Sequence, residues 1–369
     1  MTALPAPFWL PLPDAPDFPA EGFAPLADAI GRLMGTRNDV LLVQGEAMVA
    51  LEAVASSIGA PGRKVLNIAT SPYGQWFGAW LRRAGAEVTE IAGRAPGRPV
   101  TAAAVAEALA TDRFDLVALV HAESATGILN PLAEIADLTR AHGALLAVDA
   151  VASLGGHPLA LDALGVDIAV MGPQKALGGP AGTSAIAVSP AAWERIAPPG
   201  AAPSILSLGD LRAHWLETGR GALPGTPSAL EFHALAQTLA RVEAEGLEAI
   251  RTRHARAAAA ARAGARALTG TEWVPPAEAS ALVTALALPD GLSAAGVLAH
   301  VAGDTLSTGT GAVGARVIRL NHTGPRARLD NVLGDLVRLG AALAAAGWPA
   351  PTGQALAAAE TAFSETAKA

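Results

Sequence analysis

Short apolar runs alternate with helix-like stretches between residues 39 and 188. The runs lie at residues 40–43, 65–69, 116–120, 145–148, 168–171 and 184–188, and helical periodicity occurs at residues 48–58 and 75–84. Short apolar runs separated by helices are typical of buried parallel strands with helices on both faces of the sheet. Ligands of such sheets bind at the carboxyl ends of the strands, so the residues after each run are candidate site residues.

The pattern changes after residue 200. Residues 200–225 are irregular, and Pro227 opens a long helical region that reaches about residue 268. Further strand-like and helix-like segments follow at residues 282–288, 294–301, 316–320 and 329–346. We therefore expect an α/β protein with a large domain at 1–245, including an N-terminal segment at 1–20. A smaller α+β domain at 246–369 follows, with the boundary near Gly246.

Composition excludes several classes of protein. The chain is 51% hydrophobic and 16% charged, so it can bury a sizeable core and is not disordered. Its net charge is -7 and it has no basic stripe, so we expect no nucleic-acid partner. It has no cysteine, which excludes disulfides, thiolate metal sites, iron–sulfur clusters and a cysteine nucleophile. No cluster of His, Asp or Glu has metal-ligand spacing, so we expect no metal.

The N-terminal residues carry no targeting signal that we can identify. Residues 1–13 lack a basic region and are broken by prolines, which argues against a signal peptide. No stretch of about 18 apolar residues occurs, so we expect no transmembrane helix. We predict a soluble, cytoplasmic protein that does not bind membranes.

Lysine is scarce in this sequence, which makes one lysine conspicuous. The basic residues number 26, and only Lys64, Lys175 and Lys368 are lysines. Lys64 lies in a predicted turn and Lys368 in the tail, so both are expected to be solvated. Lys175 instead lies in a glycine-rich segment shortly after the apolar run 168–171.

Asp149 and Lys175 follow two runs of the predicted sheet. Asp149 comes directly after the run 145–148, so both side chains should converge on one end of the sheet. Pyridoxal requires this pair of groups: an amine for its Schiff base and a carboxylate that keeps its pyridine nitrogen protonated. A structural salt bridge between neighbouring strands is the alternative, and geometry alone favours it somewhat.

Five segments then resemble the class V aminotransferases, a family of PLP fold type I that includes alanine–glyoxylate and serine–pyruvate aminotransferases. They are AVDAVASLGG at 147–156, DIAVMGPQKALGGPAG at 167–182, HAESATGILNPL at 121–132, SPYGQW at 71–76 and RVIRLNHTG at 316–324. The resemblance covers about nine tenths of the chain, with the segments in family order. It implies an aspartate-aminotransferase-like fold, with a mostly parallel sheet flanked by helices in the large domain and a smaller C-terminal α+β domain.

The resemblance also implies roles for individual residues. Lys175 would form the Schiff base and then carry the proton during transamination, which requires a lowered pKa. Asp149 would pair with the pyridine N–H, and Tyr73, the single tyrosine of the chain, would stack on the ring. Ser124 would hydrogen-bond near the phenolic oxygen, and Gln174 would lie at the phosphate end.

Further residues are implied for the cofactor and the substrate. Arg319 would bind the substrate carboxylate with two N–H groups, although a surface charge on an edge strand is the alternative. His322 could line the pocket, or could be an ordinary satisfied histidine. Ala47 and Val151 are expected beside the cofactor. Thr226 would reach the phosphate held by a neighbouring subunit.

Glu46 departs from the family pattern. The family places small and hydroxyl residues at residues 44–48, where a helix begins, and these cradle the cofactor phosphate. Two like charges 4 Å apart repel by about 4 kcal/mol at an effective dielectric near 20, roughly a thousandfold in affinity. Alternatively, Glu46 caps the helix and turns to solvent.

One branch of the family, the pyridoxamine–pyruvate aminotransferases, has a glutamate at this position and uses unphosphorylated vitamin B6 as a substrate. Residues 44–53 and 353–362 resemble that branch. The branch binds the oxo-acid carboxylate with two arginines nine residues apart, and nine residues before Arg319 is Thr310. The short N-terminus also lacks the Gly-Pro segment of the family. Both features leave the acceptor open, and Thr226 argues for a retained phosphate.

Other functions are less well supported. Gly309, Gly311 and Gly314 spell GxGxxG but precede a strand near the C-terminus, whereas a dinucleotide fingerprint opens a helix early in a βαβ unit. A cysteine desulfurase needs a cysteine. A vitamin B6-binding sensor or an inactive homologue would have lost Lys175 or Arg319, or would carry a DNA-binding domain.

We therefore predict an aminotransferase that moves an amino group between a small amino donor and a 2-oxo acid in two half-reactions at Lys175. The cofactor is pyridoxal 5'-phosphate, or unphosphorylated pyridoxal and pyridoxamine act as substrates. The first alternative is an ordinary alanine–glyoxylate or serine–pyruvate type of enzyme. The family builds its site at a subunit interface, which implies a homodimer or homotetramer.

Overall fold

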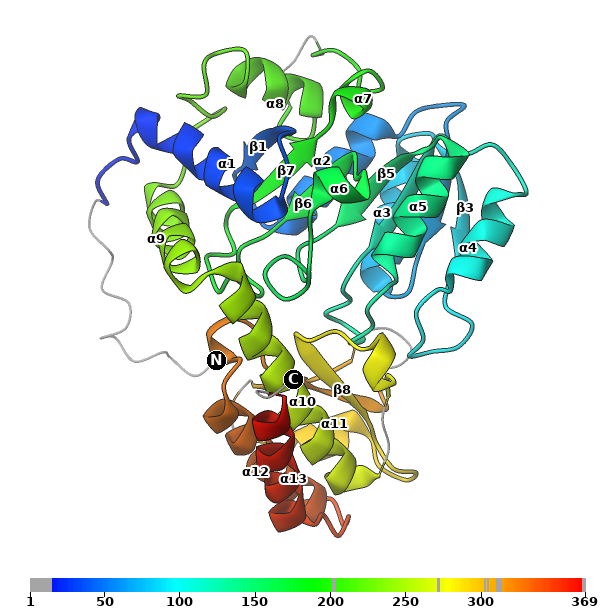
Figure 1. Ribbon diagram of the computed structural model, residues 1–369, viewed down its shortest axis with the longest axis vertical. Coiled ribbons are helices and arrows are strands. Elements are labelled where there is room, and N and C mark those ends of the chain that lie inside the picture. Colours follow the sequence, from blue (N-terminus) through cyan, green and yellow to red (C-terminus); the bar gives the residue numbers. More distant parts are fainter. Residues whose placement is uncertain are drawn as a thin grey trace.

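The computed structural model describes residues 15–200, 204–270, 273–301, 303, 305–309 and 314–366. Two bodies of unequal size are visible in Figure 1. The larger one contains a seven-stranded sheet between layers of helices, and the smaller one, coloured yellow to red, contains a three-stranded sheet packed against helices. The fold class predicted from the sequence is confirmed.

The large sheet is parallel except at one strand. Its order is β1 (Asp39–Val43), β7 (Ser184–Val188), β6 (Ile168–Met171), β5 (Leu145–Asp149), β4 (Leu116–Val120), β2 (Lys64–Ile68) and β3 (Glu87–Ile91). Strand β7 pairs antiparallel with both β1 and β6, whereas β6, β5, β4, β2 and β3 run parallel. The carboxyl ends of β4, β5 and β6 therefore lie at one edge of the sheet.

Helices cover both faces of this sheet (Figure 1). The helices of the large body are α1 (Ala20–Met34), α2 (Ala47–Ile58), α3 (Pro72–Arg83), α4 (Ala102–Leu109), α5 (Leu132–His142), α6 (Leu161–Leu164), α7 (Pro190–Trp193), α8 (Leu208–Trp215) and α9 (Ala229–Glu245). Helices α2 and α3 pack on one face, and α1 and α5 on the other. Strands β4 and β7 are buried along their whole length, which explains their uninterrupted apolar runs.

Strand β3 escapes the sequence pattern because it is an edge strand. Three of the five residues of Glu87–Ile91 are polar, and none of the five is fully buried. A search for apolar runs therefore misses it. Helix α1 and helix α13 (Thr352–Glu365) were also absent from the predicted elements, as was the three-residue strand β9 (Leu306–Thr308).

The small sheet is antiparallel, with β10 (Val317–Asn321) between β8 (Val283–Ala287) and β9. The remaining elements are α10 (Leu247–Thr269), α11 (Ala294–Leu298), α12 (Leu329–Ala345) and the short 3₁₀ helices η2 (Pro276–Glu278) and η4 (Gly324–Arg326). Helix α9 packs against α1, whereas α10 packs against α12 and α13. The change of partner occurs at Gly246, whose φ of 82° favours glycine. This change of packing partner supports the domain boundary near Gly246. The boundary itself stays a prediction.

Gly324 lies where the small domain meets the loop of Lys175. Its N–H donates to His254 Nε2 of α10 at 3.0 Å. A Cβ atom added at Gly324 would lie 2.8 Å from the carbonyl oxygen of Lys175, and the φ of Gly324 is positive. Only glycine allows this close approach of the two backbones.

Within the described ranges, no helix is both long and apolar enough to cross a membrane.

Candidate active site

Two adjoining pockets lie at the carboxyl edge of the large sheet. The first is lined by Glu46, Ala47, Met48, Leu51, Tyr73, Val120, Ala122, Ser124, Asp149, Val151, Ala152 and Lys175. The second, of about 300 Å³, is lined by Tyr73, Ser124, Ala152, Gln174, Lys175, Leu282, Val283, Arg319, Asn321 and Thr323. We call them the ring pocket and the acceptor pocket. The four residues that they share make them one continuous candidate site.

Asp149 ends β5 and is buried at the floor of the ring pocket, with 6% of its surface exposed. Its Oδ1 accepts a hydrogen bond from Val151 N–H at 2.9 Å, and no hydrogen bond to Oδ2 is found in the described part of the chain. Burial raises the pKa of Asp149 to about 6, although the Val151 N–H and the Lys175 charge lower it. A cationic N–H of a ligand would satisfy the second oxygen and restore the carboxylate.

Lys175 lies four residues after the end of β6 and lines both pockets. No hydrogen bond or ion pair of its amine is found among the described residues, so the alternative of a structural salt bridge with Asp149 is not observed. Burial lowers the pKa of Lys175, and the charge of Arg319 lowers it further, while Glu46 and Asp149 raise it. A lowered pKa increases the fraction of uncharged amine, the form that attacks carbonyl groups.

Tyr73 lies in the first turn of α3, where Ser71 is the N-cap and accepts from Tyr73 N–H at 3.2 Å. The Tyr73 ring meets the ring of Trp76 edge-on, with 5.4 Å between centroids. The side chain borders both pockets. The cap and the neighbouring ring therefore fix the aromatic wall of the site.

Glu46 is the N-cap of α2 and lines the ring pocket. Its Oε2 accepts from Met48 N–H at 2.8 Å, and its Oε1 accepts from Gln174 Nε2 at 2.8 Å. The capping role considered from the sequence is present and Glu46 is exposed, but both carboxylate oxygens also accept hydrogen bonds at the ring pocket. It occupies a backbone N–H at the helix start and is held towards the Lys175 segment by Gln174.

Arg319 of β10 projects into the acceptor pocket. Its neighbours Ile318 and Leu320 are buried in the core of the small domain, so the alternation of the strand turns Arg319 to the other face. Arg319 Nε donates to Thr308 O at 2.9 Å and Nη1 donates to Ser124 O at 2.7 Å. Among the described residues, no hydrogen bond is found for Nη2. The half-buried guanidinium is therefore anchored on one side and has donor capacity on the other.

His322 lies in neither pocket, contrary to the expectation that it lines the site. Strand alternation points it away from the face that Arg319 and Asn321 present, and its Nε2 hydrogen-bonds to Thr284 Oγ1 of β8 at 2.8 Å. Burial lowers the pKa of His322 to about 3, so it is neutral. It is a buried histidine of the core with a partner for Nε2, while no hydrogen bond to its Nδ1 is found among the described residues.

Two other predicted positions are not in these pockets. Thr226 is exposed and lines neither of them. Thr310 lies outside the described residues. Ala47 and Val151, by contrast, line the ring pocket as expected from the resemblance.

The sequence reasoning assigned no role to several residues near the site. Glu123 lies inside the segment HAESATGILNPL that carried the resemblance, but its side-chain contacts are to residues more than 50 positions earlier. The acceptor pocket is also lined by Leu282, Val283 and Asn321. In the sequence, only a strand-like pattern marked these positions, and it did not indicate a site.

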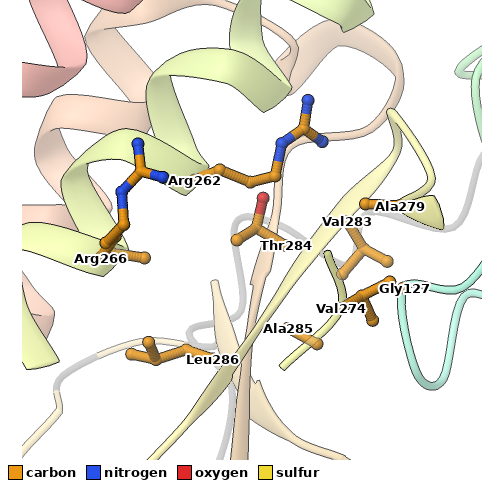
Figure 2. A pocket seen from close by; sticks show the side chains of 10 residues that line it. Gly127, Arg262, Arg266, Val274, Ala279, Val283, Thr284, Ala285 and Leu286 are labelled. Atoms are coloured by element: carbon orange, nitrogen blue, oxygen red, sulfur yellow. The ribbon is translucent and has the colours of Figure 1, made fainter. Parts of the chain in front are cut away.

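A further pocket lies in the small domain (Figure 2). Arg262 and Arg266, one turn apart on α10, border it beside Thr284 of β8, and Gly127 of the large domain closes one side. None of the predicted site residues lines it. The candidate active site is therefore confined to the ring and acceptor pockets.

The raised pKa of Asp149 predicts a pH-dependent stability in the ligand-free protein. Above pH 6 the folded state holds a buried carboxylate, and its destabilising effect disappears as the pH falls from about 6 to about 4. A shift from 3.8 to about 6 corresponds to about 3 kcal/mol. Asp149→Asn should therefore raise the free energy of unfolding at pH 8 by up to that amount.

The measurement is urea unfolding at pH 8 and pH 5, with the exposed Asp17→Asn as the control. The stabilisation by Asp149→Asn should shrink at pH 5, and Asp17→Asn should change neither value by more than about 0.5 kcal/mol. A variant at position 149 that is less stable than the native chain at pH 8 would contradict the burial argument.

Comparison with known proteins gives consistent findings. The sequence model of the family Aminotransferase class-V matches residues 24–317. The pyridoxamine–pyruvate transaminase of Mesorhizobium japonicum is 34% identical over 330 residues, 87% of this chain and 83% of that protein. The alanine–glyoxylate aminotransferase of Callithrix jacchus is 32% identical over 320 residues, 85% of this chain and 77% of the relative.

Solved structures agree with these sequence matches. Pyridoxamine-pyruvate aminotransferase from Mesorhizobium loti superposes with a TM-score of 0.87 at 32% identity, covering 95% of this chain and 90% of that chain. Ureidoglycine-glyoxylate aminotransferase from Bacillus subtilis gives a TM-score of 0.86 at 25% identity, covering 95% and 93%.

Proposed function

The chain belongs to the class-V aminotransferases, and we propose that it transfers the amino group of unphosphorylated pyridoxamine to a small 2-oxo acid. The aminotransferase class follows from the family. The nature of the donor rests on the ring pocket, and one observation carries it: the carboxylate of Glu46 caps α2 at the place where a cofactor phosphate would bind.

A phosphate at a helix start is held by backbone N–H groups and the helix dipole. Here Met48 N–H already donates to Glu46, and Gln174 holds the second carboxylate oxygen. Among the described residues, Lys175 is the only lysine or arginine that lines the ring pocket, so no second described cation there offsets the charge of Glu46. A phosphate at this point would find Met48 N–H already occupied and would be repelled by the negative charge of Glu46. An uncharged hydroxymethyl group would not be repelled.

The residues of the ring pocket fit the pyridine ring of the vitamin. Asp149 Oδ2 is available to a pyridine N–H, and burial makes an ionised pair there stronger than in water. Tyr73 supplies an aromatic wall, and Ala152 and Val151 leave room for a flat ring. When bound, pyridoxal supplies an aldehyde carbon for the amine and a ring that stabilises negative charge on the neighbouring carbon.

The side chains then have distinct tasks. Lys175 Nζ, whose pKa is lowered by burial, would act as the nucleophile and afterwards carry a proton. Arg319 binds the oxo-acid carboxylate, and its contact with Ser124 O fixes the direction of the guanidinium. Leu282 and Val283 of the small domain line the acceptor pocket and limit the access of water to these groups.

The nearby relatives support this proposal. The Mesorhizobium protein, which this chain resembles over most of its length, is named for pyridoxamine and pyruvate. A small 2-oxo acid fits the acceptor pocket of about 300 Å³, whose cations are Lys175 and Arg319. With a single described arginine there, we propose a monocarboxylic acceptor such as pyruvate or glyoxylate.

An ordinary pyridoxal 5'-phosphate enzyme of the alanine–glyoxylate type is the second candidate. The similarity to alanine–glyoxylate aminotransferases favours it, as does the exposed Thr226, which is free to contact a phosphate bound by another subunit. The contacts of Glu46 argue against it.

The assembly and location extend the same proposal. We propose a homodimer or homotetramer, since Thr226 lies outside the pockets of its own chain. Sedimentation at a multiple of 37.0 kDa would support it, and a monomer that retains full activity would contradict it. The cytoplasmic location stays a prediction.

The first test is a titration of the ligand-free protein with pyridoxal and with pyridoxal 5'-phosphate, followed by visible absorbance. The native chain should bind pyridoxal more tightly. Glu46→Ser should improve binding of the phosphate ester by up to roughly a thousandfold, because the repulsion disappears and Met48 N–H becomes available. Binding of pyridoxal should change little.

The exposed Glu107→Ser serves as the matched control and should change neither affinity. Tight binding of the phosphate ester by the native chain, unaffected by Glu46→Ser, would sink the pyridoxamine proposal. It would leave the second candidate.

The second test addresses Lys175. Lys175→Ala should abolish turnover and the absorbance of bound pyridoxal, since no other lysine of the described ranges lines the pockets. Lys64→Ala is the control, because Lys64 lies at the surface in an ion pair with Asp112. Substantial turnover of Lys175→Ala would contradict the mechanism.

A further inference from the structure

Two segments far apart in the sequence meet at a buried carboxyl group, that of Glu123. We propose that Glu123 is a positioning residue for transamination, whose side chain joins the segment of Tyr73 to the loop that holds Arg319. The inference rests on the roles proposed above for Tyr73 and Arg319. It does not depend on whether the vitamin is phosphorylated.

The carboxyl group holds the connection between β2 and α3. Glu123 is 0% exposed. Thr70 Oγ1 donates to Oε1 at 2.8 Å, and the Ser71 hydroxyl hydrogen-bonds to Oε2. Asn130 Nδ2 donates to Thr70 Oγ1 at 2.8 Å and to Val120 O at 2.8 Å, which ties the same connection to the end of β4.

This contact sets the position of the aromatic wall. Ser71 caps α3, and the same Ser71 oxygen that meets Glu123 accepts from Tyr73 N–H. An N-cap side chain fixes the backbone of the first helical turn. Because Tyr73 lies in that turn, moving Ser71 moves the Tyr73 ring.

The backbone of Glu123 organises the second element. Its N–H donates to Ile128 O and its carbonyl accepts from Gly127 N–H, both at 2.8 Å. The loop closed in this way presents the next carbonyl, that of Ser124, to Arg319 Nη1. Glu123 therefore connects the wall of the ring pocket with the cation of the acceptor pocket.

The acid acts in its neutral form. Burial raises the pKa of Glu123 to about 8, although hydrogen bonds from Ser71 and Thr70 lower it, and the Asp149 carboxylate raises it further. No ion pair of Glu123 is found within the described ranges. A neutral carboxyl group has one donor and one acceptor side, as an amide has. Glutamine therefore keeps both contacts, with Oε1 accepting from Thr70 and Nε2 donating to Ser71 Oγ, while leucine keeps a similar size without them.

The single tyrosine gives a direct readout in the ligand-free protein. Incorporation of 3-fluorotyrosine yields one ¹⁹F resonance, that of Tyr73. Glu123→Gln should leave this resonance in place, and Glu123→Leu should shift or broaden it. Thr70→Val, which removes only one arm of the contact, should produce a smaller change in the same direction.

Kinetics supply the second readout. Glu123→Leu should raise the dissociation constant of pyridoxal and the KM of pyruvate together, each by about tenfold, because it loosens both pockets. The maximal rate kcat should fall less, since Lys175 is not displaced. Glu123→Gln should restore both constants to within about threefold of the native values, and the exposed Glu107→Leu should change neither.

Several outcomes would overturn the inference. They are an unshifted resonance with unchanged constants in Glu123→Leu, or an impairment of Glu123→Gln equal to that of Glu123→Leu. If Glu123→Leu does not fold, an unshifted resonance in Thr70→Val would decide against it. These results are independent of the Glu46 titration, so failure of the pyridoxamine proposal would be seen separately.

Discussion

The parallel run of β4, β5 and β6 is the constraint on which the site depends. Because these strands share a direction, the segments that follow them converge on one edge of the sheet. Asp149 and Lys175 thereby come into one pocket without forming an ion pair with each other. A paired lysine would stay protonated and a paired aspartate would be unavailable to a ligand. The architecture thus keeps these two groups apart and leaves both available to a ligand of the ring pocket.

Three carboxyl groups in or beside the candidate site lie in three different environments. Glu46 stays at the surface of the pocket and is stabilised by a helix start. Asp149 is buried with one N–H partner, which raises its pKa to about 6 and leaves it ready for a cationic ligand. Glu123 is buried among hydroxyl groups and remains neutral at pH 7. Depth and hydrogen-bond partners, more than residue type, decide what each acid can do.

Much of the fold could be predicted from the sequence, because buried strands such as Leu116–Val120 are uninterrupted apolar runs. Strand β3 could not, since an edge strand need not be apolar. Lys175 and Asp149 stood out through scarcity and strand position. The sequence could not predict where the His322 side chain points or which residues Glu123 contacts. The direction of His322 depends on the exact strand register. The partners of Glu123 lie 52 and 53 residues away in the chain.

The capping contact of Glu46 has a consequence for the stability of helix α2 in the ligand-free protein. In a protein whose helix start is satisfied by a bound phosphate, departure of the ligand removes a stabilising partner from the fold. In this chain the partner of Met48 N–H is a side chain of the protein itself, that of Glu46, and it stays when a ligand leaves. If the vitamin is a substrate, as proposed above, it must leave in every catalytic cycle, and α2 then keeps its first turn intact while the pocket is empty. The time that a ligand spends in the ring pocket therefore does not affect the stability of α2.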